Sequence, residues 1–155
     1  MDLLIVYDGA DRSTRRTAKY LAEVASAEEA AVIVKPVATA TSEDVAGVGA
    51  LIPGCGVKMR VPFGGEPTHE MAEWIRRLPT MEGRPVGVFC TYTFFPILFA
   101  DAVTRTAETL NEMGSALEAK GANVLASQAF RRRSSPERAA RLVHSVLQGL
   151  NGLSR

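Results

Sequence analysis

The stretch LLIVYDGADRSTRRTAKYLAE, residues 3–23, determines the fold class of this 155-residue chain. Its apolar run, Leu3–Tyr7, predicts a buried parallel strand. The residues Asp8–Ser13 predict a short turn, and Thr14 is expected to open a helix. Unpaired backbone N–H groups and the positive end of a helix dipole meet at such a turn, and together they attract anions. The turn therefore predicts a phosphate-bearing ligand, although it also carries the acidic Asp11.

The rest of the chain repeats the alternation of apolar run and amphipathic segment. Valine- and isoleucine-rich runs predict strands, and capping residues before three-to-four periodicity predict helices. Further strands are expected at 31–37, 49–53 (running on into 54–56), 85–90 and 124–129. Helices are expected from a Ser42 cap through Val45, from a Thr68 cap to before Pro79, over about 100–120, and from Ser135 and Pro136 onward.

This alternation predicts an α/β protein made of one domain, residues 1–155, with a parallel sheet covered by helices on both faces. Ligands of such folds lie beyond the carboxyl ends of the strands, at the switch point of the strand order. Three irregular loops, Asp8–Ser13, Gly54–Glu66 and Thr91–Pro96, are expected to meet there. They are therefore the predicted ligand-binding loops.

Composition narrows the function classes. The chain is 46% hydrophobic and 23% charged, with a net charge of +1, as in ordinary folded proteins. A near-neutral chain has no overall field to attract nucleic acid or an anionic membrane, and its apolar runs are too short for a membrane span. Two cysteines, Cys55 and Cys90, make no disulfide framework, so a cytoplasmic protein is expected. Two separated histidines and no metal-binding motif predict no metal site.

The chain resembles the flavodoxin family over nearly its whole length. The resemblance rests on residues 3–23 and on DVAGVGALIPGCG (44–56), GRPVGVFCTYTFFP (83–96) and LEAKGANVLASQAF (117–130), in that order. It implies a flavodoxin-like three-layer sandwich whose five-stranded parallel sheet has the order 2-1-3-4-5. It also implies that the three loops bind FMN, and that the protein transfers electrons as a carrier or as a small flavin-dependent reductase.

The resemblance also implies site residues. Flavodoxins usually carry Ser or Thr, any residue, Thr, Gly, any residue and Thr after the first strand, and only Thr14 of the corresponding residues keeps its type. Backbone of the second loop would approach the flavin ring, and Tyr92 would stack on it beside Thr91 and Thr93. The FMN contacts implied in this way are Gly9, Ala10, Asp11, Arg12, Ser13, Thr14, Gly54, Cys55, Gly56, Thr91, Tyr92 and Thr93.

The first loop leaves two functions open. A carboxylate beside a phosphate dianion is opposed by several kcal/mol at an effective dielectric constant of about 20. Arg12, Arg15 and Arg16 could offset this repulsion, or they could form a solvated helix face. The alternative to an FMN-dependent electron carrier is therefore a flavodoxin-like domain that has lost FMN and serves as a binding or regulatory module.

Two further features carry weaker hypotheses. Cys55 and Cys90 end neighbouring strands of the predicted sheet and could form a redox-active pair, whereas buried cysteine is more often a small apolar side chain. The basic run Arg131–Arg133 precedes the last helix. It is expected to be a solvated turn or a docking site for an acidic partner, because the near-neutral chain carries no stacking aromatics there beyond Phe130.

Overall fold

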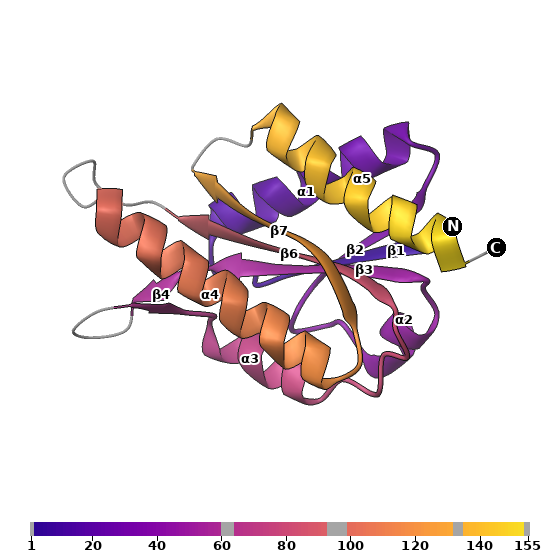
Figure 1. The fold of residues 1–155 in the computed structure, drawn as a ribbon, viewed down its shortest axis with the longest axis horizontal. Helices are drawn as coiled ribbons and strands as arrows, with labels where there is room; N and C mark the ends of the chain where they lie inside the picture. The colour runs from indigo at the N-terminus through magenta and orange to yellow at the C-terminus, as the bar shows by residue number, and fades with distance from the viewer. Residues whose placement is uncertain (1, 60–63, 93–98, 132–134, 154–155) are drawn as a thin grey trace.

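The computed structural model describes residues 2–59, 64–92, 99–131 and 135–153. Five parallel strands form one sheet in the order β2-β1-β3-β6-β7 (Figure 1). Counted along the chain as the five long strands, this is the predicted order 2-1-3-4-5, so the predicted fold class is confirmed. The elements are β1 (Asp2–Tyr7), α1 (Arg12–Ala27), β2 (Ala31–Pro36), α2 (Ser42–Ala46), β3 (Ala50–Gly56), β4 (Lys58–Met59), β5 (Gly65–Glu66), α3 (His69–Arg76), β6 (Pro85–Tyr92), α4 (Phe99–Ala119), β7 (Asn123–Arg131) and α5 (Pro136–Leu153).

Helices cover both faces of the sheet. Helices α1 and α5 lie on one face, and α3 and α4 lie on the other (Figure 1). The side chains of β1 alternate between the two cores: Leu3 and Ile5 join the α1–α5 core, and Leu4 and Val6 join the α3–α4 core. All four are fully buried, because a central parallel strand is covered on both sides and reads as one apolar run.

The alternation continues to the carboxyl ends of the strands, where the site lies. In β3 and β6, Ile52 and Phe89 join the α1–α5 core. Phe89 pairs with Gly54, and the next pair in register is Cys55 with Cys90. Gly56 and Thr91 are the next pair and therefore point to the α1 side again. A single step along either strand thus decides which face of the sheet a side chain reaches.

Three boundaries differ from the sequence predictions at this edge. Strand β6 continues through Thr91 and Tyr92, which pair with the end of β7, so part of the predicted third loop is strand. The predicted second loop contains a two-stranded antiparallel hairpin, β4–β5. Helix α1 begins at Arg12 rather than at Thr14. All three lengthen regular structure toward the site. The two strand differences arise because local apolar patterns did not contain the pairing partners, and the start of α1 is set by its N-cap, Asp11.

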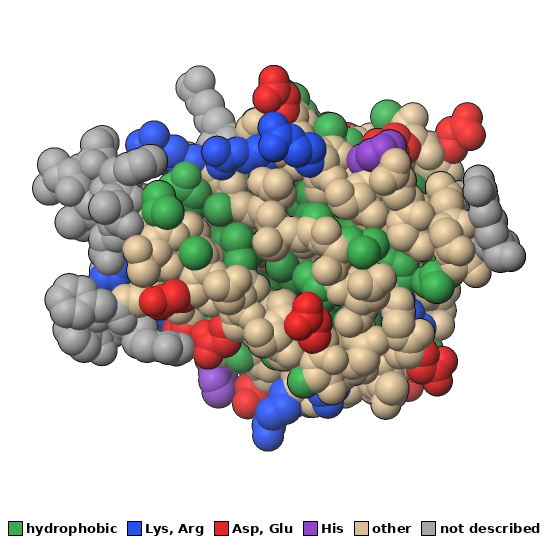
Figure 2. Space-filling view, in the orientation of Figure 1, with side chains coloured by type: hydrophobic (Ala, Val, Ile, Leu, Met, Phe, Trp, Pro, Cys, Tyr) green, Lys and Arg blue, Asp and Glu red, His purple; other side chains and the backbone are tan. Residues whose placement is uncertain are grey.

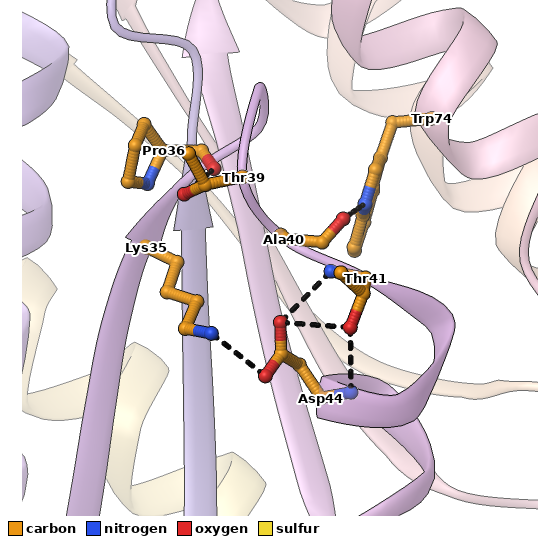
Figure 3. Close-up of polar contacts among 7 residues, drawn as sticks. All are labelled: Lys35, Pro36, Thr39, Ala40, Thr41, Asp44 and Trp74. Carbon is orange, nitrogen blue, oxygen red and sulfur yellow. Dashed lines mark hydrogen bonds and ion pairs between the residues drawn. The ribbon is translucent and has the colours of Figure 1, made fainter.

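The cap of α2 also differs from the prediction (Figure 3). Thr41, not Ser42, is the N-cap: its hydroxyl accepts from Asp44 N at 3.2 Å, and the Asp44 carboxylate accepts from Thr41 N at 2.8 Å. Asp44 also pairs with Lys35 at 2.8 Å, and Trp74 Nε1 donates to the Ala40 carbonyl at 3.0 Å. The segment after β2 is therefore fixed to α2 and α3 by side chains.

Candidate functional site

The first loop is closed by an acidic cap. Asp11 is the N-cap of α1, and its Oδ1 accepts from Ser13 N at 2.9 Å. Asp8 similarly accepts from Ala10 N at 3.0 Å. These bonds satisfy two backbone donors that the sequence analysis assigned to a phosphate. The carboxylate of Asp11 therefore occupies part of the anion position at this helix end.

Oxygen atoms from the N-cap of α1, from α1 itself and from β6 meet over Gly56. The Oγ1 atoms of Thr14 and Thr91 lie 2.6 Å apart and are buried. An added Cβ at Gly56 would lie 3.5 Å from Asp11 Oδ2, 3.8 Å from Thr14 Oγ1 and 4.0 Å from Thr91 Oγ1. We call these four residues, Asp11, Gly56, Thr14 and Thr91, the oxygen cluster. One hydroxyl of the threonine pair donates to the other, which leaves the second hydroxyl a donor for a neighbouring acceptor.

The two glycines that end β3 have different roles. A Cβ at Gly54 would lie 2.2 Å from two ring atoms of Phe89, so the missing side chain makes room for the α1–α5 core. At Gly56 an added Cβ would make only ordinary contacts with the three oxygens. Packing against Phe89 therefore explains the glycine at position 54, whereas no packing contact requires a glycine at position 56.

The β4–β5 hairpin is held by α4 across the edge of the sheet. Arg105 is 5% exposed and its Nη1 donates to the Gly64 carbonyl at 2.7 Å. Glu108 accepts from Gly65 N at 2.9 Å. The Cβ of a residue at position 65 would lie 2.3 Å from the Arg105 carbonyl oxygen. Arg105 and Glu108 lie far from the hairpin in sequence, and no local pattern indicated this contact.

The two cysteines lie side by side in a dry environment. Cys55 and Cys90 are in register, fully buried and free. Cys55 Sγ lies 3.7 Å from Met113 Sδ, and Cys90 Sγ lies 4.0 Å from the Thr106 carbonyl oxygen. Burial raises the pKa of the Cys55 thiol to about 11 and raises that of Cys90 further. Because the thiolate is the reactive form, these environments disfavour the redox-pair hypothesis.

Two buried oxygens beside the first and second loops have no hydrogen-bond partner within the described part of the chain. They are Asp8 Oδ2 and Thr68 Oγ1. Thr68 precedes α3, but its hydroxyl makes no cap hydrogen bond, contrary to the predicted capping role. The Thr68 hydroxyl lies beside the Cys55 thiol, whereas Asp8 Oδ2 requires a donor from a ligand or from water. Asp8, which directly follows an apolar strand, is a polar residue that the sequence analysis did not select.

The remaining predicted contacts are placed only in part. Gly9 and Ala10 are exposed at the loop surface, and Arg12 is an exposed residue of the first turn of α1. Tyr92 is half-buried at the end of β6. Thr93 lies outside the described residues, as does most of the third loop. The structure therefore brings Asp11, Thr14 and Thr91 together with Gly56, whereas stacking by Tyr92 stays a prediction.

No family model and no curated protein matches the sequence. Solved structures do match. The two-electron-reduced flavodoxin of Megasphaera elsdenii superposes with a TM-score of 0.76 at 19% identity over 94% of this chain and 98% of that one. The chain has the flavodoxin fold. A Streptococcus pneumoniae TIGR4 flavodoxin superposes with a TM-score of 0.72 at 17% identity, over 96% of this chain and 99% of that one. A short-chain flavodoxin associated with a non-canonical PDU bacterial microcompartment superposes with a TM-score of 0.75 at 13% identity, over 100% of this chain and 99% of that one.

The likeness to these flavodoxins spans both chains almost completely, so the resemblance stated from sequence is confirmed at the level of the fold. At these identities the fold alone is shared, and site chemistry must be argued from this chain. Within residues 2–59, 64–92, 99–131 and 135–153, no helix is both long and apolar enough to cross a membrane. The same residues hold no cluster of three His, Cys, Asp or Glu side chains suited to a metal ion.

Proposed function

We propose that this protein binds FMN at the carboxyl edge of its sheet and transfers electrons to and from partner proteins. The observation that supports the proposal most directly is the oxygen cluster. It lies beyond the switch point between β1 and β3, where ligands of doubly wound folds bind. When bound, FMN supplies one- or two-electron chemistry that amino-acid side chains lack.

The residues of the oxygen cluster fit the phosphate end of FMN with one exception. The hydroxyl left free by the Thr14–Thr91 pair can donate to a phosphate oxygen, and so can backbone N–H groups at the start of α1. Asp11 is the exception, because its carboxylate accepts from Ser13 N and repels a second anion. In our proposal phosphate binding displaces the Asp11 side chain from Ser13 N toward solvent.

The ring end of FMN would contact the ends of β3 and β6. Glycine at position 56 lets backbone approach a flat ligand, and Tyr92 ends β6 beside it in the sheet. Asp8 Oδ2 is an unpaired buried acceptor at the first loop, and it suits a ligand that carries N–H groups. Burial of this edge by the β4–β5 hairpin would restrict water around the flavin.

The test is a flavin titration of protein purified without added cofactor. We expect FMN fluorescence to be quenched at micromolar concentrations, and FMN to raise the melting temperature because it binds only the folded state. Gly56→Ala should weaken FMN binding while leaving the melting temperature of the free protein nearly unchanged, since its methyl group meets only ordinary contacts. Gly114→Ala, which adds the same methyl group in α4, is the matched control.

A colourless protein whose fluorescence titration and melting temperature both ignore about 100 μM FMN would contradict the proposal. That outcome would leave the fold intact and give the carboxyl edge to another ligand. Equal loss of FMN affinity in Gly56→Ala and Gly114→Ala would contradict the placement of the site.

A further inference from the structure

Four cations form one face of α1. Residues 12, 15, 16 and 19 share one side of the helix, because successive residues are turned by about 100°. The buried residues Thr14, Thr17, Ala18 and Leu21 lie on the opposite side. Arg15, Arg16 and Lys19 thus point away from the sheet and from the oxygen cluster. They are exposed to solvent, and the ion pairs of the described residues include none between Asp11 and these three side chains.

This face carries more positive than negative charge: Glu23 is the acidic residue of α1 on the same side, and the N-cap Asp11 lies at its start. Within the described part of the chain, Arg12, Arg15, Arg16 and Lys19 make no ion pair, and all four are exposed. The first turn of α1 has no acidic residue. Cations at a helix N-terminus oppose the helix dipole, and four close cations repel one another. Folding alone does not account for such an arrangement, whereas an anionic partner would.

Helix α5 extends the same surface. Its Arg138 and Arg141 are exposed, and α5 packs beside α1 on one face of the sheet. Figure 2 shows a row of Lys and Arg side chains in the region of α5 and the end of β7, with most acidic side chains of that view below it. We call the six residues Arg12, Arg15, Arg16, Lys19, Arg138 and Arg141 the basic face. The basic face holds six of the 18 Lys and Arg residues, and Arg141 of this face also pairs with Glu137 at 4.0 Å.

We propose that the basic face docks an acidic protein. The depression lined by its four α1 residues is about 290 Å³ and lies on an exposed helix, where no buried polar group would hold a small anion. Its six side chains include no aromatic ring on which bases could stack. A compact acidic protein can contact the basic face alone. An extended polyanion such as DNA would also approach the acidic side chains elsewhere on this near-neutral chain and be repelled by them.

The basic face adjoins the proposed flavin site, so a role for the docked protein in electron transfer rests on the proposed function. Arg12 directly follows Asp11, so the basic face begins at the edge of the sheet that carries the oxygen cluster. A partner docked there lies beside the proposed flavin site, as electron transfer between proteins requires. The docking itself depends only on charge and is therefore testable without flavin.

The experiment is an NMR titration of the ¹⁵N-labelled protein at low ionic strength. The probe is a plant-type [2Fe–2S] ferredoxin, a small acidic electron carrier, and basic cytochrome c is the opposite-charge control. We expect ferredoxin to shift backbone amides in the first halves of α1 and α5, and cytochrome c not to do so. Raising the salt concentration should weaken the binding, because charges on an interface rim are screened.

Charge variants separate docking from flavin binding. R15Q/R16Q should weaken ferredoxin binding about tenfold, whereas the matched pair R76Q/R77Q on α3 changes net charge equally and should leave it unchanged. R15E/R16E should weaken it further without lowering the melting temperature, because acidic residues suit a helix N-terminus. Ferredoxin binding is measured on protein without flavin, so loss of docking is distinguishable from loss of flavin binding.

Three outcomes would overturn the proposal. The first is an absence of ferredoxin binding at low ionic strength. The second is amide shifts that map away from α1 and α5, or equal weakening by the two neutral pairs. The third is tighter binding of a DNA duplex of about 20 base pairs, or of inorganic pyrophosphate, to the same amides, which would assign the face to nucleic acid or to a small anion.

Discussion

The two faces of the sheet differ in chemistry at its carboxyl edge. On the α1 side the edge ends in the oxygen cluster, with hydroxyls 2.6 Å apart and a carboxylate beside them. On the α3–α4 side, one residue earlier in the same two strands, it ends in two buried thiols. The same backbone therefore presents hydroxyl and carboxylate oxygens to one side and buried thiols to the other. The difference follows from the two-residue period of a strand.

The largest expected effect tests the packing on which the α1 side depends. Gly54→Ala should lower the free energy of unfolding by about 1–3 kcal/mol, because its Cβ would lie 2.2 Å from the Phe89 ring. Gly114→Ala is the matched control and should be neutral or stabilising, since its Cβ has room and alanine favours a helix. Chemical denaturation measures both. Equal stability of the two variants would show that Phe89 does not require the glycine.

The second prediction concerns the hydroxyl pair. Thr91→Val should cost about 2 kcal/mol of unfolding free energy, because it leaves the buried Thr14 hydroxyl without its partner. The double variant T14V/T91V should recover much of that loss, since both polar groups are then removed. A double-mutant cycle measured by denaturation gives the coupling. Strictly additive losses would mean that the two hydroxyls do not interact.

The third prediction concerns the acidic cap. Asp11→Thr should tighten FMN binding about tenfold, because a threonine cap keeps α1 closed while removing a charge that opposes the phosphate. Riboflavin has no phosphate, so its affinity should not change. Fluorescence titrations of both flavins check this result. A parallel gain for riboflavin, or no change for FMN, would contradict our account of the first loop.

The smallest predicted effect lies on the thiol side and depends on pH. Burial raises the pKa of Cys55 from 9.0 to about 11, so the folded protein holds this proton more tightly than the unfolded chain does. The contribution to stability is fully present below about pH 9 and is lost as pH rises through about 11. When the pH is raised from about 8 to 9.5, the free energy of unfolding should fall in the parent protein. In Cys55→Ala this fall should be smaller by about 0.8 kcal/mol. Identical pH profiles would contradict the burial argument.

The sheet could be predicted from sequence because its strands are continuous apolar runs, as in Leu3–Tyr7, and each is followed by a helix with a clear period. Features set by distant residues could not be predicted. The hairpin at Gly65 depends on Arg105 and Glu108 of α4. The end of β6 at Tyr92 depends on pairing with Arg131.

The start of α1 is a different kind of error. Asp11 is a favourable N-cap residue, and the local sequence allowed the helix to begin after it. The expectation of a phosphate loop extended the turn to Ser13 instead. The oxygen cluster itself combined predictable and unpredictable parts: Thr14 and Thr91 were expected to contact FMN, whereas their contact with each other required the register of β3 and β6.

The tie between the hairpin and α4 has a consequence for local unfolding. Gly64 and Gly65 are bonded to Arg105 and Glu108, and not to any strand of the main sheet. The hairpin therefore opens only when these two side chains of α4 release it. Amide hydrogen exchange at Gly65 should follow the exchange of the neighbouring turns of α4 and should be independent of the sheet. The β5 side of the hairpin is thus expected to open together with these turns of α4, while Val57, just before β4, is bonded to the Thr91 carbonyl of β6.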